Sequence, residues 1–178
     1  MRLLRTIYRS EGLKLDERMI SREAVRAIVL DDRQVLMVYS PVNKDYKFPG
    51  GGIQEWESHE EALCREIREE CGVILSTVGK EYGYIAEYSK PREKEYDVFR
   101  QISYYYFCKV DPLFVGQNLD SYERELGMRP EWVSIEHALR ANKSVLNGEF
   151  GQVPRWTLRD TWVLEQIAKE KRVRGNGF

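Results

Sequence analysis

Three glutamates, Glu66, Glu69 and Glu70, stand at positions i, i+3 and i+4 of a segment with helical periodicity. On an α-helix these positions share one face, so the three carboxylates would crowd into a sector roughly 100° wide. Like charges at this spacing repel each other. A hard divalent cation such as Mg²⁺ would relieve the repulsion, because it prefers carboxylate and water oxygens. The spacing therefore indicates either a metal site or an ordinary solvated acidic face.

The residues that flank the acidic face favour the metal site. Gly50, Gly51 and Gly52 precede the helix, and consecutive glycines let a backbone approach another group closely. Arg65 lies four residues before Glu69, so its guanidinium can hold that carboxylate in one orientation. A purely solvated acidic face would require neither the glycine run nor the arginine.

The helix that carries these groups has a start and a stop signal in the sequence. Ser58 followed by Glu61 three residues later forms a capping box, and Gly72 is a natural left-handed end. A separate apolar stripe can pack against a sheet and consists of Leu63, Ile67 and Cys71. The helix can therefore bury one face while it presents the carboxylates to a pocket.

The surrounding elements predict an α/β (α+β) domain in which a mixed sheet is packed between helices. Residues 22–32 and 34–40 form a predicted strand pair around a tight turn. The other predictions are an edge strand within residues 1–20, strands over 81–89 and 98–110, a strand leading into a helix over 130–140, and a terminal helix over 154–172 with Pro154 at its first position. The strand over 98–110 is expected in the middle of the sheet, and we expect one domain over residues 1–178.

Composition sets limits on the class of protein. The 178 residues carry a formal net charge of −1, which argues against a large basic surface for a nucleic acid polymer. Three cysteines without a paired spacing predict reduced core thiols rather than a disulfide framework or a zinc site. The first residues are charged and the apolar runs are short, so we expect a cytoplasmic protein without a membrane segment.

The acidic helix and its flanks together carry a recognisable motif. The pattern is Gly51-x5-Glu57-x7-Arg65-Glu66-Ile67-x-Glu69-Glu70-x-Gly72-Val73. It resembles the Nudix box of the Nudix (MutT-like) hydrolases. The resemblance implies a Nudix-like α/β/α sandwich and a Mg²⁺-dependent enzyme that also accepts Mn²⁺. Such an enzyme would cleave a pyrophosphate bond in a nucleoside diphosphate linked to another group, by attack of water on phosphorus; an unmodified or oxidised (d)NTP is one candidate substrate.

The resemblance also implies roles for individual box residues. Glu69 and Glu70 match metal ligands, and Glu66 matches either a further ligand or the general base. Glu57 and Arg65 match positions that brace the loop and orient the catalytic glutamates.

Two further oxygen ligands are expected around the box. One is a backbone carbonyl of the glycine run, from Gly50 or Gly51, of which Gly51 is favoured. The other is a glutamate from the loop before Trp132, where Glu123 and Glu125 are both available and Glu125 is favoured.

Substrate contacts are less clearly marked in the sequence. Arg26 and Lys47 can hold phosphates, and Phe48 can stack on a base. For residues of these types, a core aromatic or a plain surface charge is the commoner explanation. The expected partner is a small nucleotide. The alternative function is a non-catalytic Nudix-like domain that senses a nucleotide or nucleotide sugar.

The terminal helix has two apolar faces. One holds Trp156, Val163, Leu164 and Ile167, and the roughly opposite one holds Leu158 and Trp162. Burial on both sides predicts either a covering loop or a homodimer contact.

Overall fold

The centre of the molecule is a seven-stranded mixed sheet with the order β1-β5-β6-β2-β3-β4, and β7 also pairs with β3. The computed structural model describes residues 1–175. Its strands are β1 (Leu3–Tyr8), β2 (Met19–Asp31), β3 (Gln34–Ser40), β4 (Asp45–Lys47), β5 (Val73–Ser89), β6 (Val98–Phe114) and β7 (Arg129–Ser134). Its helices are α1 (His59–Cys71), α2 (Ser121–Glu125), α3 (Ile135–Leu146) and α4 (Arg155–Gly175).

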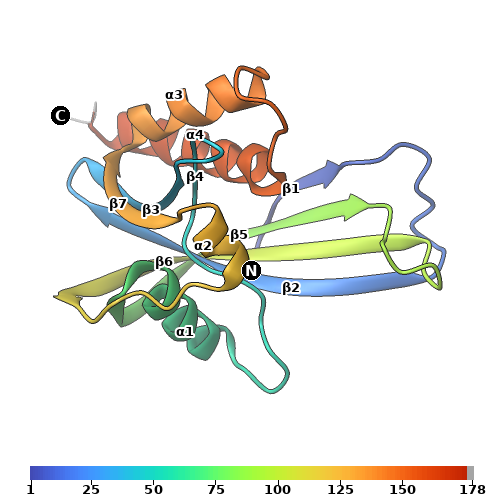
Figure 1. Cartoon of the computed structure of the whole chain (residues 1–178), viewed down its shortest axis with the longest axis horizontal. Coiled ribbons are helices and arrows are strands. Elements are labelled where there is room, and N and C mark those ends of the chain that lie inside the picture. Colours follow the sequence, from blue (N-terminus) through green and yellow to red (C-terminus); the bar gives the residue numbers. More distant parts are fainter. Residues whose placement is uncertain (176–178) are drawn as a thin grey trace.

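The helices lie on both faces of this sheet. Helix α1 covers one face, and α3 and α4 cover the other (Figure 1). Strand β6 lies between β5 and β2, and pairs antiparallel with β5 and parallel with β2. Strand β1 forms the edge and runs parallel to β5. The predicted α/β/α sandwich with a mixed sheet, a central β6 and an edge β1 is therefore confirmed.

Several element boundaries differ from the prediction. Strand β5 starts directly after α1, eight residues earlier than the predicted strand, and β6 continues to Phe114. These extensions pair with each other through irregular registers, so apolar and polar residues do not alternate regularly along them in the sequence. The short helix α2 was not predicted. Helix α4 starts at Arg155, one residue after Pro154, and residues 176–178 of the predicted domain lie outside the described part of the chain.

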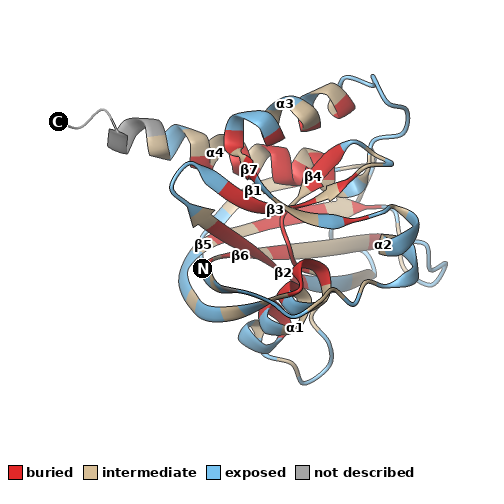
Figure 2. Ribbon diagram, turned by 60° about the vertical axis from the view of Figure 1, so that its left-hand side comes forward, coloured by how far each residue is buried: buried red, intermediate tan, exposed pale blue. Residues whose placement is uncertain are grey.

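Two apolar cores lie on opposite sides of the sheet (Figure 2). Strand β2 shows how the sequence divides between them. Val25, Ala27 and Val29 pack beneath α1, whereas Ile28 faces the core shared with α3 and α4. Because side chains alternate along a strand, Arg26 points to the same side as Ile28.

Helix α1 has the ends that the sequence predicts. The Ser58 hydroxyl accepts the Glu61 N–H at 3.2 Å, and the Glu61 carboxylate accepts the Ser58 N–H at 2.8 Å. Gly72 adopts φ 66°, and its N–H donates to the Arg68 carbonyl at 3.0 Å. The residues of its apolar stripe, Leu63, Ile67 and Cys71, are fully buried.

Helix α4 covers both of its apolar faces within the chain. Val163, Leu164 and Ile167 are buried in the core between the sheet and α3. On the other side, Leu158 and Trp162 pack partly buried against the same core, and the Arg5 guanidinium lies 5.6 Å from the Trp162 ring centroid. The homodimer hypothesis therefore loses the observation that suggested it.

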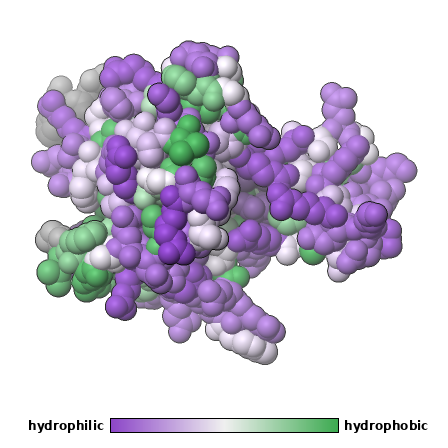
Figure 3. Space-filling model, viewed as in Figure 1, coloured by the Kyte–Doolittle hydropathy of each residue, from purple (hydrophilic) through white to green (hydrophobic). Residues whose placement is uncertain are grey.

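The surface is mainly polar on the face shown in Figure 3, with an apolar patch at its left-hand edge, where β6 ends. Exposed apolar residues at that end of β6 include Leu113 and Phe114. Within residues 1–175, no helix is long and apolar enough to cross a membrane. The three cysteines, all in the described part, are free thiols; Cys71 and Cys108 are buried as predicted, whereas Cys64 is exposed.

Candidate active site

The glycine run places Gly50 directly against the buried end of the acidic face. The Gly50 N–H donates to Glu70 Oε2 at 2.8 Å. Gly50 has φ 133°, and a Cβ at this position would lie 2.1 Å from the Val25 carbonyl oxygen. Only glycine fits this turn without strain. The turn therefore fixes the backbone donor that holds Glu70.

Glu70 is the most buried of the box carboxylates, at 1% exposure. Its other oxygen, Oε1, accepts a hydrogen bond from Lys47 Nζ at 2.6 Å. Burial raises the pKa of the Glu70 carboxyl to about 7, and the negative charges of Glu123 and Glu66 add to the rise while the Lys47 ammonium opposes it. Burial acts to lower the pKa of Lys47, but Glu70 and Glu123 outweigh it, so the pKa of the ammonium is raised.

Glu123, rather than Glu125, lies beside Glu70. Helix α2 begins with a capping box in which the Asp120 carboxylate accepts the Glu123 N–H at 2.7 Å. The same Glu123 side chain accepts a hydrogen bond from Lys47 Nζ at 3.2 Å. Glu125 is exposed on the opposite side of this short helix. The structure therefore brings Glu123 to the box carboxylates and not Glu125, which the sequence favoured. The D-x-x-E capping pattern is the signal that could have identified α2.

The loop that leads to α2 is fastened to the end of α1. The Val115 N–H donates to the Gly72 carbonyl at 2.7 Å, and the Asn118 N–H donates to the Glu69 carbonyl at 2.9 Å. The Gln117 side-chain amide donates to the Glu70 carbonyl at 2.6 Å. These bonds satisfy carbonyls that a helix end leaves free, and they hold the segment that brings Glu123 to the site.

Arg65 braces the exposed end of the acidic face. Its guanidinium donates to both oxygens of Glu57, at 2.7 and 2.8 Å, and to the Gly52 carbonyl at 3.0 Å. It also donates to Glu66 at 2.6 Å and to Glu69 at 3.2 Å. Its hydrogen bonds lower the pKa of Glu57, whereas the carboxylates raise the pKa of Arg65 itself. One arginine thus links the glycine loop to three of the box glutamates.

Gly51 provides room for Glu66. A Cβ on Gly51 would lie 2.3 Å from Glu66 Oε1, so the absence of a side chain creates the space that this carboxylate fills. The Gly51 carbonyl accepts the Val25 N–H at 3.0 Å and is therefore already engaged in the sheet.

The predicted substrate residues have different surroundings. Arg26 is 9% exposed, and its Nε has no hydrogen-bond partner among residues 1–175. Burial and the nearby Arg159 lower the pKa of Arg26, and the negative charges of Asp160 and Glu70 counter them. Phe48 is fully buried, and its ring meets Tyr105 edge to face at 5.7 Å. The prediction that Phe48 stacks on a base is therefore wrong, because this ring is part of the core.

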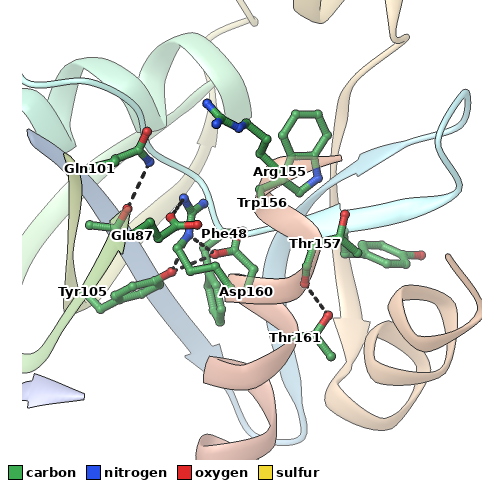
Figure 4. A network of polar contacts seen from close by, with 12 residues as sticks. Phe48, Glu87, Gln101, Tyr105, Arg155, Trp156, Thr157, Asp160 and Thr161 are labelled. Carbon is green, nitrogen blue, oxygen red and sulfur yellow. Dashed lines mark hydrogen bonds and ion pairs between the residues drawn. The ribbon is translucent and has the colours of Figure 1, made fainter. Parts of the chain in front are cut away.

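A buried polar network fixes the loop of residues 48–51, which leads into the glycine run, to α4 (Figure 4). Asp160 Oδ2 accepts the Phe48 N–H at 3.1 Å, and Oδ1 accepts the Tyr105 hydroxyl at 2.7 Å and Arg159 Nε at 2.9 Å. Arg159 Nη1 in turn pairs with Glu87 on β5 at 3.0 Å. The network sets the position of the backbone that leads to Gly50. Sequence reasoning missed it, because its members come from four distant segments.

Asp45 and Trp156 form a second link to α4 that the sequence did not reveal. Asp45 Oδ2 accepts the Trp156 indole N–H at 2.7 Å and the Thr157 hydroxyl at 2.6 Å. Burial raises the pKa of Asp45. The Trp156 ring centroid lies 5.9 Å from Lys47 Nζ, so the indole stands at the edge of the acidic site.

The donor set suits a hard divalent cation, although the carboxylates are paired with cationic side chains. Glu66, Glu69, Glu70 and Glu123 supply oxygen donors around the ends of Lys47 and Arg65. No group of three His, Cys, Asp or Glu side chains within the described residues already converges on one metal position. The oxygen donors suit a hard divalent cation in their chemistry, but the side chains must rearrange before they can surround one.

A groove adjoins the exposed end of this cluster. It has a volume of about 790 Å³ and is lined by Arg65, Arg68 and Glu69 of α1, by Ile74 at the start of β5 and by residues 115–118. Volumes of this size are typical of small-molecule sites.

Comparison with known proteins places this architecture in a family. A family model described as NUDIX domain matches residues 20–152. The chain is 38% identical over 72 residues to a CTP pyrophosphohydrolase from Escherichia coli, an alignment that covers 38% of this chain and 50% of that protein. It is 32% identical over 100 residues to an RNA pyrophosphohydrolase from a Nitratiruptor species, covering 51% of this chain and 64% of that protein. The chain thus spans half to two thirds of the length of these relatives.

A solved structure supports the fold independently. The NUDIX hydrolase from Nitrosomonas europaea superposes with a TM-score of 0.54 at 18% identity, over 81% of this chain and 90% of that one. With the Nudix box on α1, the sandwich around it and a family match over most of the sequence, this chain belongs to the Nudix hydrolase family.

Proposed function

We propose that this protein is a divalent-metal-dependent pyrophosphohydrolase that cleaves a phosphoanhydride bond of a nucleoside diphosphate derivative. Mg²⁺ is the proposed cofactor, and Mn²⁺ can substitute. The observation that carries the proposal is the cluster of four carboxylates at one end of α1, with Glu70 buried against the Gly50 N–H. A solvated acidic face would have no reason to bury Glu70 or to recruit Glu123.

Glu69, Glu70 and Glu123 are the proposed metal-holding side chains. The expected backbone ligand is the Gly50 carbonyl rather than that of Gly51, because the Gly51 carbonyl is already bonded to Val25. A bound divalent cation would screen the phosphates and polarise their oxygens. Glu66, which fills the space left by Gly51, is the proposed general base for the attacking water.

The remaining residues position these groups and the substrate. Arg65 and Glu57 hold Glu66 and Glu69 in place through their shared hydrogen bonds. The proposed phosphate contacts are Lys47 and Arg26, whose Nε has no hydrogen-bond partner within residues 1–175. The groove beside Glu69 is the proposed location for the rest of the nucleotide.

The substrate is tested with a panel of nucleotides assayed with Mg²⁺ or Mn²⁺. The panel contains CTP, other (d)NTPs, oxidised dNTPs, ADP-ribose, nucleotide sugars and dinucleoside polyphosphates. Because one relative is named an RNA pyrophosphohydrolase, an RNA with a 5′-terminal triphosphate is included. Hydrolysis in ¹⁸O-labelled water identifies the phosphorus that is attacked. Tight nucleotide binding without any hydrolysis would instead support the sensing-domain alternative.

The oligomeric state is a separate question. Light scattering is expected to give a mass near 21 kDa, since the apolar faces of α4 are covered within one chain.

A further inference from the structure

Lys47 stands where two of the proposed metal ligands meet. Its ammonium lies 2.6 Å from Glu70 Oε1 and 3.2 Å from Glu123 Oε1. The three side chains are almost enclosed, with side-chain exposures, counted without the backbone, of 11% for Lys47, 2% for Glu70 and 14% for Glu123. A positive charge thus already bridges the two carboxylates that, under the proposed function, hold the divalent cation.

The ammonium and a divalent cation would need the same oxygens. The second oxygen of Glu70 is taken by the Gly50 N–H, so Oε1 is the oxygen with which Glu70 can meet a cation. A Mg²⁺ ligand oxygen lies about 2.1 Å from the metal, which would bring the ion within a few ångströms of the ammonium. Like charges at that separation repel strongly in an enclosed site, where water screens them poorly.

We propose that Lys47 competes with the divalent cation, and that its ammonium leaves Glu70 and Glu123 when the metal binds and then pairs with a phosphate of the substrate. This inference rests on the proposed metal-dependent function and deepens it. It makes Lys47 a residue that couples metal binding to phosphate binding, in addition to a simple phosphate contact.

The surroundings of Lys47 favour a phosphate as the new partner of the ammonium. Arg26 lies close enough to act on the charge of Lys47, and its own Nε has no partner among the described residues. Once a divalent cation neutralises the carboxylates, Arg26 and Lys47 become an excess of positive charge in a buried place. A pyrophosphate group supplies the negative charge that offsets it. The Trp156 ring, 5.9 Å from Nζ, gives the ammonium a second contact during the exchange.

The test measures Mn²⁺ affinity in the absence of substrate, by electron paramagnetic resonance of free Mn²⁺. Lys47→Met removes the competing charge and is expected to tighten Mn²⁺ binding at least about tenfold relative to wild type. Lys47→Gln keeps a neutral hydrogen-bond donor for Glu70 and is also expected to tighten Mn²⁺ binding. It replaces Lys47→Met in the test if that variant does not fold. Lys80→Met removes one charge from an exposed position on β5 and is the matched control, with wild-type affinity expected.

The second measurement repeats the titrations with imidodiphosphate, a non-hydrolysable pyrophosphate analogue. The analogue is expected to increase the Mn²⁺ affinity of every protein tested. The factor of increase should be at least about tenfold larger for wild type than for either Lys47 variant, because only wild type has an ammonium that can move to the analogue. Unchanged or weaker Mn²⁺ binding in both Lys47 variants, with wild type still binding Mn²⁺, would overturn the competition and leave the proposed function intact. An equal gain in Lys80→Met would also overturn it. Absence of Mn²⁺ binding to any of the proteins would remove the proposed metal site and this inference together.

Discussion

Replacement of Gly51 by alanine tests whether the position of the Glu66 carboxylate governs turnover. The new Cβ would lie 2.3 Å from Glu66 Oε1 and 2.5 Å from its Cδ, whereas ordinary contacts begin near 3.4 Å. The carboxylate must therefore retreat by roughly 1 Å. A displacement of this size in a reacting group lowers turnover by about 10²-fold. The φ angle of Gly51 lies outside the left-handed region, so the backbone itself accepts alanine.

The two neighbouring glycines are matched controls with different expected results. In Gly52→Ala the Cβ meets the end of the exposed Arg22 side chain at 2.6 Å, which can move aside, so activity and stability should be close to wild type. In Gly50→Ala the Cβ meets the Val25 carbonyl oxygen at 2.1 Å with φ at 133°, so the protein should lose at least about 2 kcal/mol of unfolding free energy.

For each variant, kcat on the best substrate of the nucleotide panel and the thermal unfolding midpoint are measured, and each value is compared with that of wild type. Gly51→Ala is expected to lose turnover while its free energy of unfolding changes by less than about 1 kcal/mol, because the atoms that must shift are the end of the Glu66 side chain and not backbone. Wild-type kcat in Gly51→Ala would refute the reasoning, and so would an equal loss of kcat in Gly52→Ala.

Four other perturbations have defined outcomes. Glu69→Gln or Glu70→Gln should lower turnover about 10²-fold or more with the circular dichroism spectrum retained, and wild-type activity in either variant would exclude that residue as a metal ligand. Ser58→Ala should cost about 1 kcal/mol in urea denaturation through the lost cap, with activity still measurable. Asp160→Ala should cost about 3–5 kcal/mol in the same experiment, because it leaves the buried Arg159 without this partner; a loss below about 1 kcal/mol would contradict the network. The pKa of Glu70 is about 7 in the folded protein against 4.5 for the free group, so the folded state binds more protons between these values and the unfolding free energy falls as pH rises from about 4.5 to 7, by up to about 3 kcal/mol from this group. Urea denaturation in EDTA at both ends of that window checks this sign, and Glu70→Gln should show a shallower decline than wild type.

The architecture could be predicted from the sequence to a large extent, because it is marked by periodic patterns. The hairpin of β2 and β3 and the strand that leads into α3 follow from apolar runs and turn residues. The start of β5 could not be predicted, because its first half is mostly exposed and pairs irregularly with β6. Helix α2 is a five-residue helix without buried residues, so no apolar periodicity marks it.

Within the candidate site, contacts between residues close in the sequence could be predicted, whereas contacts between distant residues could not. The Arg65 contacts with Glu66, Glu69 and Glu57 span one, four and eight residues, and the box pattern predicts them. The Lys47 contacts with Glu70 and Glu123 span 23 and 76 residues. From the sequence, Lys47 is a candidate phosphate contact, and Glu123 and Glu125 are alternative metal ligands. Nothing in the sequence indicates that Lys47 and Glu123 contact each other.

The sequence by itself determined a capped helix with three carboxylates on one face and an apolar stripe on another, because capping bonds and side-chain spacing act within a few turns of one helix. Only the tertiary structure decided which carboxylate is buried, which loop glutamate joins it and that Phe48 belongs to the core. Those outcomes depend on how β4, α2 and α4 pack around the end of α1, and packing between distant segments leaves no periodic trace in the order of the residues.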